Sequence, residues 1–216
     1  MKYIKQYEKN DWLLKEFINA IYKDAEYYDD IKSEDNGLLK RVKHYIIDRK
    51  VDINGKYTNV DNRSEETPLH MVIHLYNYPK YVYAEKIAIF LINNGADINI
   101  KTSYGFTPLM LATSIGSVRI VKKLIEKGAD VDAQDNDGNT AFIKGINTRY
   151  GFNEQEVGEL IKAGADWFLA NNKGEYPYKL LKIRLGDYSM KNIIAKNYPE
   201  EYENAVMIAN AKKYNI

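Results

Sequence analysis

The stretch "TSYGFTPLMLATSIGSVRIVKKLIEKGADVD", Thr102–Asp132, decides the fold of this chain. Thr107 can cap a helix with its hydroxyl, and Pro108 suits the first helical position, where its missing N–H leaves no bond unmade. Gly116 interrupts the helical pattern, and Gly128 supplies the left-handed backbone that ends a second helix. The stretch therefore predicts two short helices joined by a turn.

Apolar residues in both helices recur at helical spacing. We expect the inward face of the first helix to consist of Leu109, Ala112 and Ile115, and that of the second to consist of Val118, Val121, Leu124 and Ile125. One such helix pair cannot bury its apolar face alone, so the sequence predicts that similar units stack on both sides of it.

Copies of this unit recur along the chain. The tripeptide "GAD" begins at Gly95, Gly128 and Gly164, with spacings of 33 and 36 residues. A threonine-led segment precedes each copy, and the three segments are "TPLHMV" from Thr67, "TPLMLA" from Thr107 and "TAFIKG" from Thr140. Degenerate copies of parts of the unit are "RKVDIN" at 49–54 and "EYPYKLL" at 175–181.

The pattern "GxTPLxxA…GAD" with a period of 33 residues resembles the ankyrin repeat family. The resemblance covers about residues 61–168. It implies an all-α repeat solenoid of stacked helix–turn–helix units joined by β-hairpin-like loops. We expect capping helices and a degenerate repeat in residues 1–60, three repeats at 61–100, 101–134 and 135–170, and a degenerate repeat with a capping helix in residues 171–216.

The composition excludes several classes of function. The 31 Lys and Arg residues nearly balance 30 Asp and Glu residues, which leaves no global basic field for nucleic acid. The chain has no cysteine, which fits a reducing compartment, and its longest apolar run, 87–92, is too short to span a bilayer. We expect a cytoplasmic monomer that binds neither nucleic acid nor membrane, while secretion without a signal peptide stays open.

His70 and His74 have the spacing of a zinc-ligand pair on a helix. However, Met71 stands where a metalloprotease needs a glutamate to activate water, and the one other histidine, His44, belongs to a different expected unit. The resemblance instead implies that His70 packs at the base of its helix and hydrogen-bonds Thr67.

No other group of residues indicates a catalytic or cofactor-binding site. The chain has no Gly-rich phosphate loop, and no serine nucleophile has a plausible partner. The acidic pair Glu156 and Glu159 is expected on the solvated flank of a helix. We therefore expect no catalytic residue, no metal site and no cofactor.

Positions that differ between the copies are the candidates for function. In proteins of the resembled family, hairpin tips and first helices line a concave face that holds a protein partner. By that resemblance the contact residues are Arg63, Ser64, Glu66, His74, Ser103, Tyr104, Phe106, Ser114, Asn136, Asp137, Asn139 and Asn147. Exposed aromatic side chains are common interface anchors, so Tyr104 and Phe106 stand out, although they could instead shield the hairpin from water.

A seven-residue insertion provides a second candidate surface. Its segment "LYNYPKYVY" holds four tyrosines, and insertions in repeat arrays usually form surface loops. The secondary candidates are Tyr76, Tyr78, Tyr81 and Tyr83. With 19 tyrosines in the chain, their abundance could equally reflect the base composition of the genome.

These patterns predict a non-catalytic protein–protein interaction module. The alternative is a small inhibitor, an immunity protein or a host-directed effector that blocks one specific enzyme or toxin. An enzyme with an unrecognised site is disfavoured, because repeats and caps account for nearly the whole chain.

Overall fold

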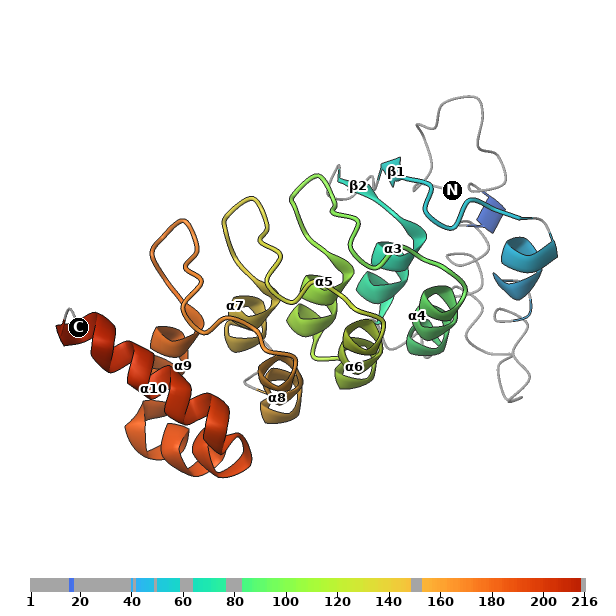
Figure 1. Cartoon of the computed structure of the whole chain (residues 1–216). Coiled ribbons are helices and arrows are strands. Elements are labelled where there is room, and N and C mark those ends of the chain that lie inside the picture. Colours follow the sequence, from blue (N-terminus) through green and yellow to red (C-terminus); the bar gives the residue numbers. More distant parts are fainter. Residues whose placement is uncertain are drawn as a thin grey trace. The chain divides into compact units, whose positions relative to one another are not determined.

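The computed structural model describes residues 16–17, 40, 42–48, 50–58, 64–76, 83–148 and 153–214. These residues fall into two compact units, Met1–Pro108 and Leu109–Ile216, which are described separately (Figure 1). Most of residues 1–60, where capping helices and a degenerate repeat were expected, lie outside the described residues. No helix in the described ranges is both long and apolar enough to cross a bilayer.

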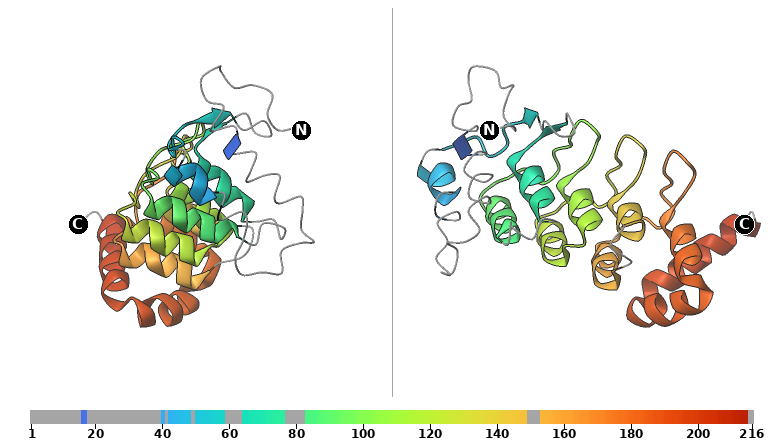
Figure 2. Two further views of the ribbon diagram at one scale, coloured as in Figure 1. Left: turned by 90° about the vertical axis from the view of Figure 1, so that its right-hand side faces the viewer. Right: turned by 180° about the vertical axis from the view of Figure 1, so that it is seen from behind.

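The first unit is built from short elements. In chain order they are the π-helical turn η2 (His44–Asp48), the strands β1 (Tyr57–Thr58) and β2 (Glu65–Glu66), and the helices α3 (Pro68–Leu75) and α4 (Ala84–Asn93). The two strands pair antiparallel, with Tyr57 opposite Glu66. Helices α3 and α4 pack side by side in every view (Figures 1 and 2).

Helix α3 is buried over almost its whole surface. Seven of its eight residues are buried, so His74 is the one position where α3 keeps substantial exposure. Helix α4 has a narrower buried face, which includes Ile87, Ala88 and Leu91. This difference is expected of stacked pairs, because the first helix lies between its neighbours and the second has one solvent-facing side.

The second unit holds most of the helices. Helix α5 (Pro108–Ile115) begins at the boundary, and the others are α6 (Val118–Glu126), α7 (Ala141–Ile146), α8 (Glu154–Lys162), α9 (Pro177–Ser189), η3 (Met190–Ala195) and α10 (Pro199–Tyr214). Helix α8 packs against α6 and α7, and α10 packs against η3. The segment expected to form a C-terminal helix is α10.

The ends of α5 and α6 agree with the sequence prediction. Gly116 directly follows α5 with a φ of 78°, and Gly128 follows α6 with a φ of 86°. A side chain with a Cβ rarely adopts this left-handed conformation, so glycine is the residue that permits each helix to stop there.

The expected inward face of α6 was partly wrong. Its buried residues are Ile120, Val121 and Leu124, whereas Val118 and Ile125 are half-buried. The buried face is therefore rotated from the expected one, because the tertiary contact with α8 decides which side of α6 is covered.

Candidate protein-binding surface

His70 is a structural residue with both ring nitrogens engaged. Its Nδ1 accepts hydrogen bonds from the Thr67 backbone N–H at 3.2 Å and from the Thr67 hydroxyl at 2.8 Å. The ring proton is therefore on Nε2, which donates to the Phe106 carbonyl at 3.2 Å. Burial lowers the pKa of His70 to about 4, so the ring is neutral at pH 7. The predicted contact between His70 and Thr67 is confirmed.

The two histidines of α3 do not belong to a larger cluster of metal-ligating side chains within the described residues. Across the described ranges, no group of three His, Cys, Asp or Glu side chains is arranged to hold an ion. Both nitrogens of His70 already have partners within the protein, which leaves that ring without a lone pair for a metal.

His74 lies beside a buried carboxylate. Its side chain is 38% exposed, and its Nε2 is 3.6 Å from Oε1 of Glu66. The other carboxylate oxygen of Glu66 accepts a hydrogen bond from the Tyr57 hydroxyl at 3.2 Å. Glu66 thus contacts Tyr57 with one carboxylate oxygen and lies within ion-pair distance of His74 with the other.

Two of the expected contact residues are buried. Ser64 is 0% exposed and Glu66 is 1% exposed, so neither side chain offers a surface to a partner. Both belong to the segment around β2, which is covered where it pairs with β1. Pairing of these strands could not be inferred from the repeat pattern alone.

The first hairpin tip, Ser103 and Tyr104, is held by several hydrogen bonds. The Thr102 N–H donates to the Phe106 carbonyl at 2.9 Å, and the Gly105 N–H donates to the Thr102 carbonyl at 2.9 Å. Ser103 Oγ accepts from the Glu65 N–H at 2.9 Å. The turn therefore has a defined backbone and is tied to the neighbouring strand β2.

Tyr104 and Phe106 have different environments on this hairpin. Tyr104 is 49% exposed, whereas Phe106 is half-buried. Their ring centroids are 6.5 Å apart, so the two rings are in contact range. The Phe106 ring packs beside that of Tyr104, which keeps about half of its surface exposed.

The second hairpin tip, Asn136 and Asp137, is organised by the buried carboxylate of Asp135. That carboxylate accepts from the Asp137 N–H at 3.0 Å and the Asn139 N–H at 2.8 Å, and it pairs with Lys144 Nζ at 2.7 Å. Burial alone would raise the pKa of Asp135, but the bonds from Lys144 and Asn139 outweigh it and hold the pKa below its ordinary value. Asp135 is therefore ionised at neutral pH and fixes the loop.

Asn139 takes part in this internal network instead of facing a partner. Its Nδ2 donates to Asp135 at 3.3 Å, and its Oδ1 accepts from Asn171 Nδ2 at 2.9 Å. Asn136 and Asp137 keep exposed side chains, although their backbone carbonyls accept hydrogen bonds from Asn172. The second tip is thus polar at its surface and rigid beneath.

The first helices of the second unit contribute one exposed candidate. Asn147 is exposed at the end of α7. Ser114 is half-buried, and its hydroxyl donates to the Met110 carbonyl at 2.8 Å within α5. The carbonyl of Ser114 also accepts from Thr148 Oγ1 at 3.0 Å, so Ser114 mainly links α5 to the end of α7.

The tyrosine-rich insertion is only partly described. Tyr76 is 37% exposed directly after α3, and Tyr83 is half-buried directly before α4. Arg63, Tyr78 and Tyr81 lie outside the described residues.

Two structural residues of this region were not predicted from the sequence. Asp135 and Asn171 occupy the same place in successive repeats, at the start of "DNDGN" and "NNKGE". In both repeats, a short polar side chain three residues before glycine accepts hydrogen bonds from backbone N–H groups of its own turn. This local spacing is a signal from which both residues could have been found.

The expectation that Glu156 is solvated was wrong. Glu156 is 0% exposed, and neither carboxylate oxygen has a hydrogen-bond partner, nor does the buried hydroxyl of Ser117. Burial raises the pKa of Glu156 to about 8, so the carboxyl is mostly neutral at pH 7. Its neighbour Glu159 instead pairs with Lys122 at 3.6 Å and Lys162 at 3.2 Å.

Known proteins share the repeat pattern of this chain. It is 38% identical over 84 residues to the human protein "Transient receptor potential cation channel subfamily A member 1", with 35% of this chain and 8% of that protein covered. It is 35% identical over 112 residues to the mouse "Ankyrin repeat and SAM domain-containing protein 6", with 49% of this chain and 12% of that protein covered. The chain thus spans a small part of the length of each of these proteins.

A family model for ankyrin repeats in three copies matches residues 33–135 and 81–171, which together make up more than half of the chain. The helix pairs α3–α4, α5–α6 and α7–α8 lie within these ranges. The mostly helical fold fits the all-α repeat solenoid expected for such repeats. The chain belongs to the ankyrin repeat family.

Proposed function

We propose that this chain is a non-catalytic binding module that holds a protein partner with its hairpin tips and the exposed ends of its first helices. Ankyrin repeats generally mediate protein–protein interactions. The cysteine-free composition fits a reducing compartment, and under the same proposal we place the interaction in the cytoplasm.

The exposure of Tyr104 carries this proposal. The ring is 49% exposed on a turn that is tied to β2 through Ser103, and Phe106 packs against it. Tyrosine provides a large amphipathic contact area with only two side-chain torsions to restrict. A turn that is already ordered adds little further entropy loss when a partner covers it.

Each unit, considered by itself, also has exposed polar side chains of the kind that suit the rim of an interface. The exposed residues are Ser103 in the first unit and Asn136, Asp137 and Asn147 in the second, and the His74 side chain in the first unit is 38% exposed. Their donors and acceptors can adapt to a partner while internal networks hold the backbone beneath them. We exclude Ser64, Glu66, Ser114 and Asn139 from direct contact, because their side chains are buried or engaged within the fold.

The proposal is tested by capture of partners on the immobilised full-length chain from an extract of its cell of origin. We expect Tyr104→Ala to reduce retention of the main partner about tenfold or more, because anchor residues carry most of the binding energy. The midpoint of thermal unfolding should stay within about 2 °C of the wild-type value, since the ring is largely exposed.

Ile183→Ala is the matched control, because Ile183 is 72% exposed on α9, outside the proposed surface. Equal retention by the Tyr104 and Ile183 variants would refute the proposal, and a large loss of stability would place the Tyr104 ring in the core. Capture of one dominant enzyme or toxin would indicate an inhibitor or immunity protein. Capture of several unrelated proteins would indicate an adaptor.

A further inference from the structure

An asparagine that precedes a glycine can lose its side-chain amide, because the glycine nitrogen reaches the asparagine Cγ without hindrance from a Cβ. The chain contains three such pairs, which are Asn36–Gly37, Asn54–Gly55 and Asn94–Gly95. The first pair lies outside the described residues, and the other two belong to the first unit. Their surroundings differ, so the structure distinguishes a protected pair from an accessible one.

The Asn54–Gly55 pair is protected by hydrogen bonds. Asn54 Nδ2 donates to the Gly95 carbonyl at 3.3 Å, and Asn54 Oδ1 accepts from the Asp97 N–H at 2.7 Å. Both ends of this side-chain amide are therefore held by the "GAD" segment of the following repeat. The Gly55 N–H donates to the Asp52 carbonyl at 3.1 Å. Reaction at Asn54 thus requires that three hydrogen bonds break.

The Asn94–Gly95 pair is exposed at the C-terminal end of α4. Among the described residues, the Asn94 amide has one hydrogen bond, from Nδ2 to the Phe90 carbonyl at 2.8 Å. The Gly95 N–H makes none with these residues, whereas the equivalent Gly128 and Gly164 donate to the preceding helix at 2.9 Å and 3.0 Å. No described atom beyond its chain neighbours lies within 4 Å of the place of a Cβ at Gly95, so this backbone is open to water.

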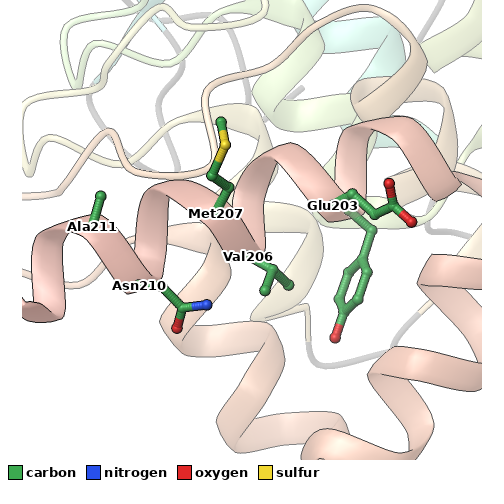
Figure 3. Close-up of a pocket in the computed structure, with 6 residues that line it drawn as sticks. Glu203, Val206, Met207, Asn210 and Ala211 are labelled. Atoms are coloured by element: carbon green, nitrogen blue, oxygen red, sulfur yellow. The ribbon is translucent and has the colours of Figure 1, made fainter.

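Exposure alone does not make an asparagine reactive in this way. Asn210 is exposed and projects from α10, and Ala211 is the next residue of that helix (Figure 3). Ala211 carries a Cβ, and it lies inside α10, where helical hydrogen bonds engage the backbone N–H groups. Asn94 differs in both respects, because α4 has ended and a glycine follows.

We propose that Asn94 is a site of spontaneous deamidation, at which the end of α4 acquires aspartate and isoaspartate as the protein ages. The Gly95 nitrogen forms a bond to Cγ of Asn94, the bond from Cγ to Nδ2 breaks, and the proton of the Gly95 N–H leaves with Nδ2 as ammonia. Water then opens the cyclic imide. Opening at the main-chain carbonyl gives isoaspartate, and opening at the side-chain carbonyl gives aspartate. This reaction goes beyond the proposed function, because it requires no protein partner.

The reaction should loosen the contact between two repeats. Isoaspartate adds one atom to the main chain directly before Gly95, and the Gly95 and Asp97 backbone groups are those that hold Asn54. Both products also place a carboxylate at the C-terminal end of α4 and remove the amide donor to the Phe90 carbonyl. Negative charge is unfavourable at that end of a helix.

Peptide mass spectrometry of the full chain, incubated at slightly alkaline pH and sampled over days, tests this proposal. Trypsin places the three Asn–Gly pairs in different peptides, since lysines lie between them. We expect Asn94 to react about tenfold or more faster than Asn54, because reaction at Asn54 must break two further hydrogen bonds. Asn210 should remain unchanged. Equal rates at Asn94 and Asn54 in the folded chain, or no reaction at Asn94, would overturn the proposal.

The same experiment in urea shows whether the fold sets the difference. In the unfolded chain Asn54 and Asn94 should react at rates within about threefold of each other, since both then precede an unprotected glycine. A tenfold difference that persisted in urea would refute the structural explanation. Labelling with protein isoaspartyl methyltransferase separates isoaspartate from aspartate at Asn94.

Hydrogen exchange of aged protein tests the effect on the repeat contact. Residues 50–58 should exchange about threefold or more faster in aged than in fresh wild-type protein. Asn94→Lys is the matched control, because Lys127 precedes the equivalent Gly128, and its exchange should not change with age. Equal exchange in fresh and aged wild-type protein, after Asn94 has reacted, would refute the proposed loosening.

Discussion

At the scale of single residues, the two histidines of α3 show how position on one helix decides a role. His70 faces inward and is neutral, with its proton donated to the Phe106 carbonyl. His74 lies one turn later, where α3 reaches the surface, and is within ion-pair distance of the buried carboxylate of Glu66. The same type of side chain is therefore buried in the repeat framework at one position and partly exposed at the other.

Glu156 leads to a prediction about pH. Its pKa in the folded chain, about 8, lies above its ordinary value of 4.5, so the folded state holds this proton more tightly than the unfolded state. The free energy of unfolding should therefore fall as pH rises from 4.5 through 8. Glu156→Gln removes this ionisation, and we expect it to raise the free energy of unfolding by roughly 1–4 kcal/mol at about pH 8.5 and to change it little at about pH 5.

Urea unfolding at a series of pH values measures this effect. Glu159→Gln serves as the control, because Glu159 lies on the same helix, is half-buried and pairs with two lysines. Its replacement should lower stability slightly at both pH values. His70 acts in the opposite direction: its folded pKa of about 4 lies below 6.5, so its contribution is lost as pH falls through that interval. A Glu156→Gln protein with the pH profile of the wild type would contradict the prediction.

At the scale of elements, the packing of α8 depends on the absence of a side chain. A Cβ at Gly158 would overlap the hydroxyl of Tyr198, whose ring is 8% exposed. Gly145 in α7 differs, because a Cβ there would meet Val157 at 3.7 Å, an ordinary contact. The equivalent position of the preceding repeat is Ala112, which shows that the framework accepts a methyl group at this place.

We therefore expect Gly158→Ala and Gly145→Ala to have opposite effects. Gly158→Ala should lower the free energy of unfolding by about 1–3 kcal/mol through overpacking, although alanine is the better helix former. Gly145→Ala should be neutral or raise it by up to about 1 kcal/mol. Urea unfolding measures both. In a Tyr198→Ala background the penalty at Gly158 should disappear, and a penalty that persisted there would show that Tyr198 is not its cause.

At the scale of the whole molecule, each repeat depends on its immediate neighbours. Helix α8 packs against α6 and α7, and α10 packs against η3. In such arrays the free energy of unfolding is approximately the sum of the stability of each repeat and of the interfaces between adjacent repeats. A destabilising substitution should therefore affect mainly the repeat that carries it and the adjacent ones.

Hydrogen exchange of the full chain tests whether a substitution destabilises mainly the helices next to it. His70→Ala leaves the buried Phe106 carbonyl without its donor, so we expect faster exchange in α3 and α4, by about tenfold or more, with little change in α10. Gly158→Ala should give the complementary profile, with the largest increase in α8 and α10. A uniform increase over all helices in both variants would show that the chain opens only as one cooperative body.

The local chemistry of the chain allowed much of this fold to be predicted. Gly116 and Gly128 mark helix ends because their backbone conformation is a property of the residue and its neighbours in sequence. The repeat period indicated the family, and the resemblance to that family implied the contact between Thr67 and His70. This contact is local, because its two residues are three positions apart in the sequence.

Tertiary packing decided the rest. Glu156 and Glu159 stand on the same helix three residues apart, yet one is buried without a partner and the other pairs with two lysines. Ser64 and Glu66 were expected at the surface and are covered beside β1. Which side of an element faces solvent depends on contacts between segments far apart in sequence, and no local pattern records those contacts. For this reason the repeats were predicted from the sequence, whereas only the folded structure decided which of their side chains are exposed.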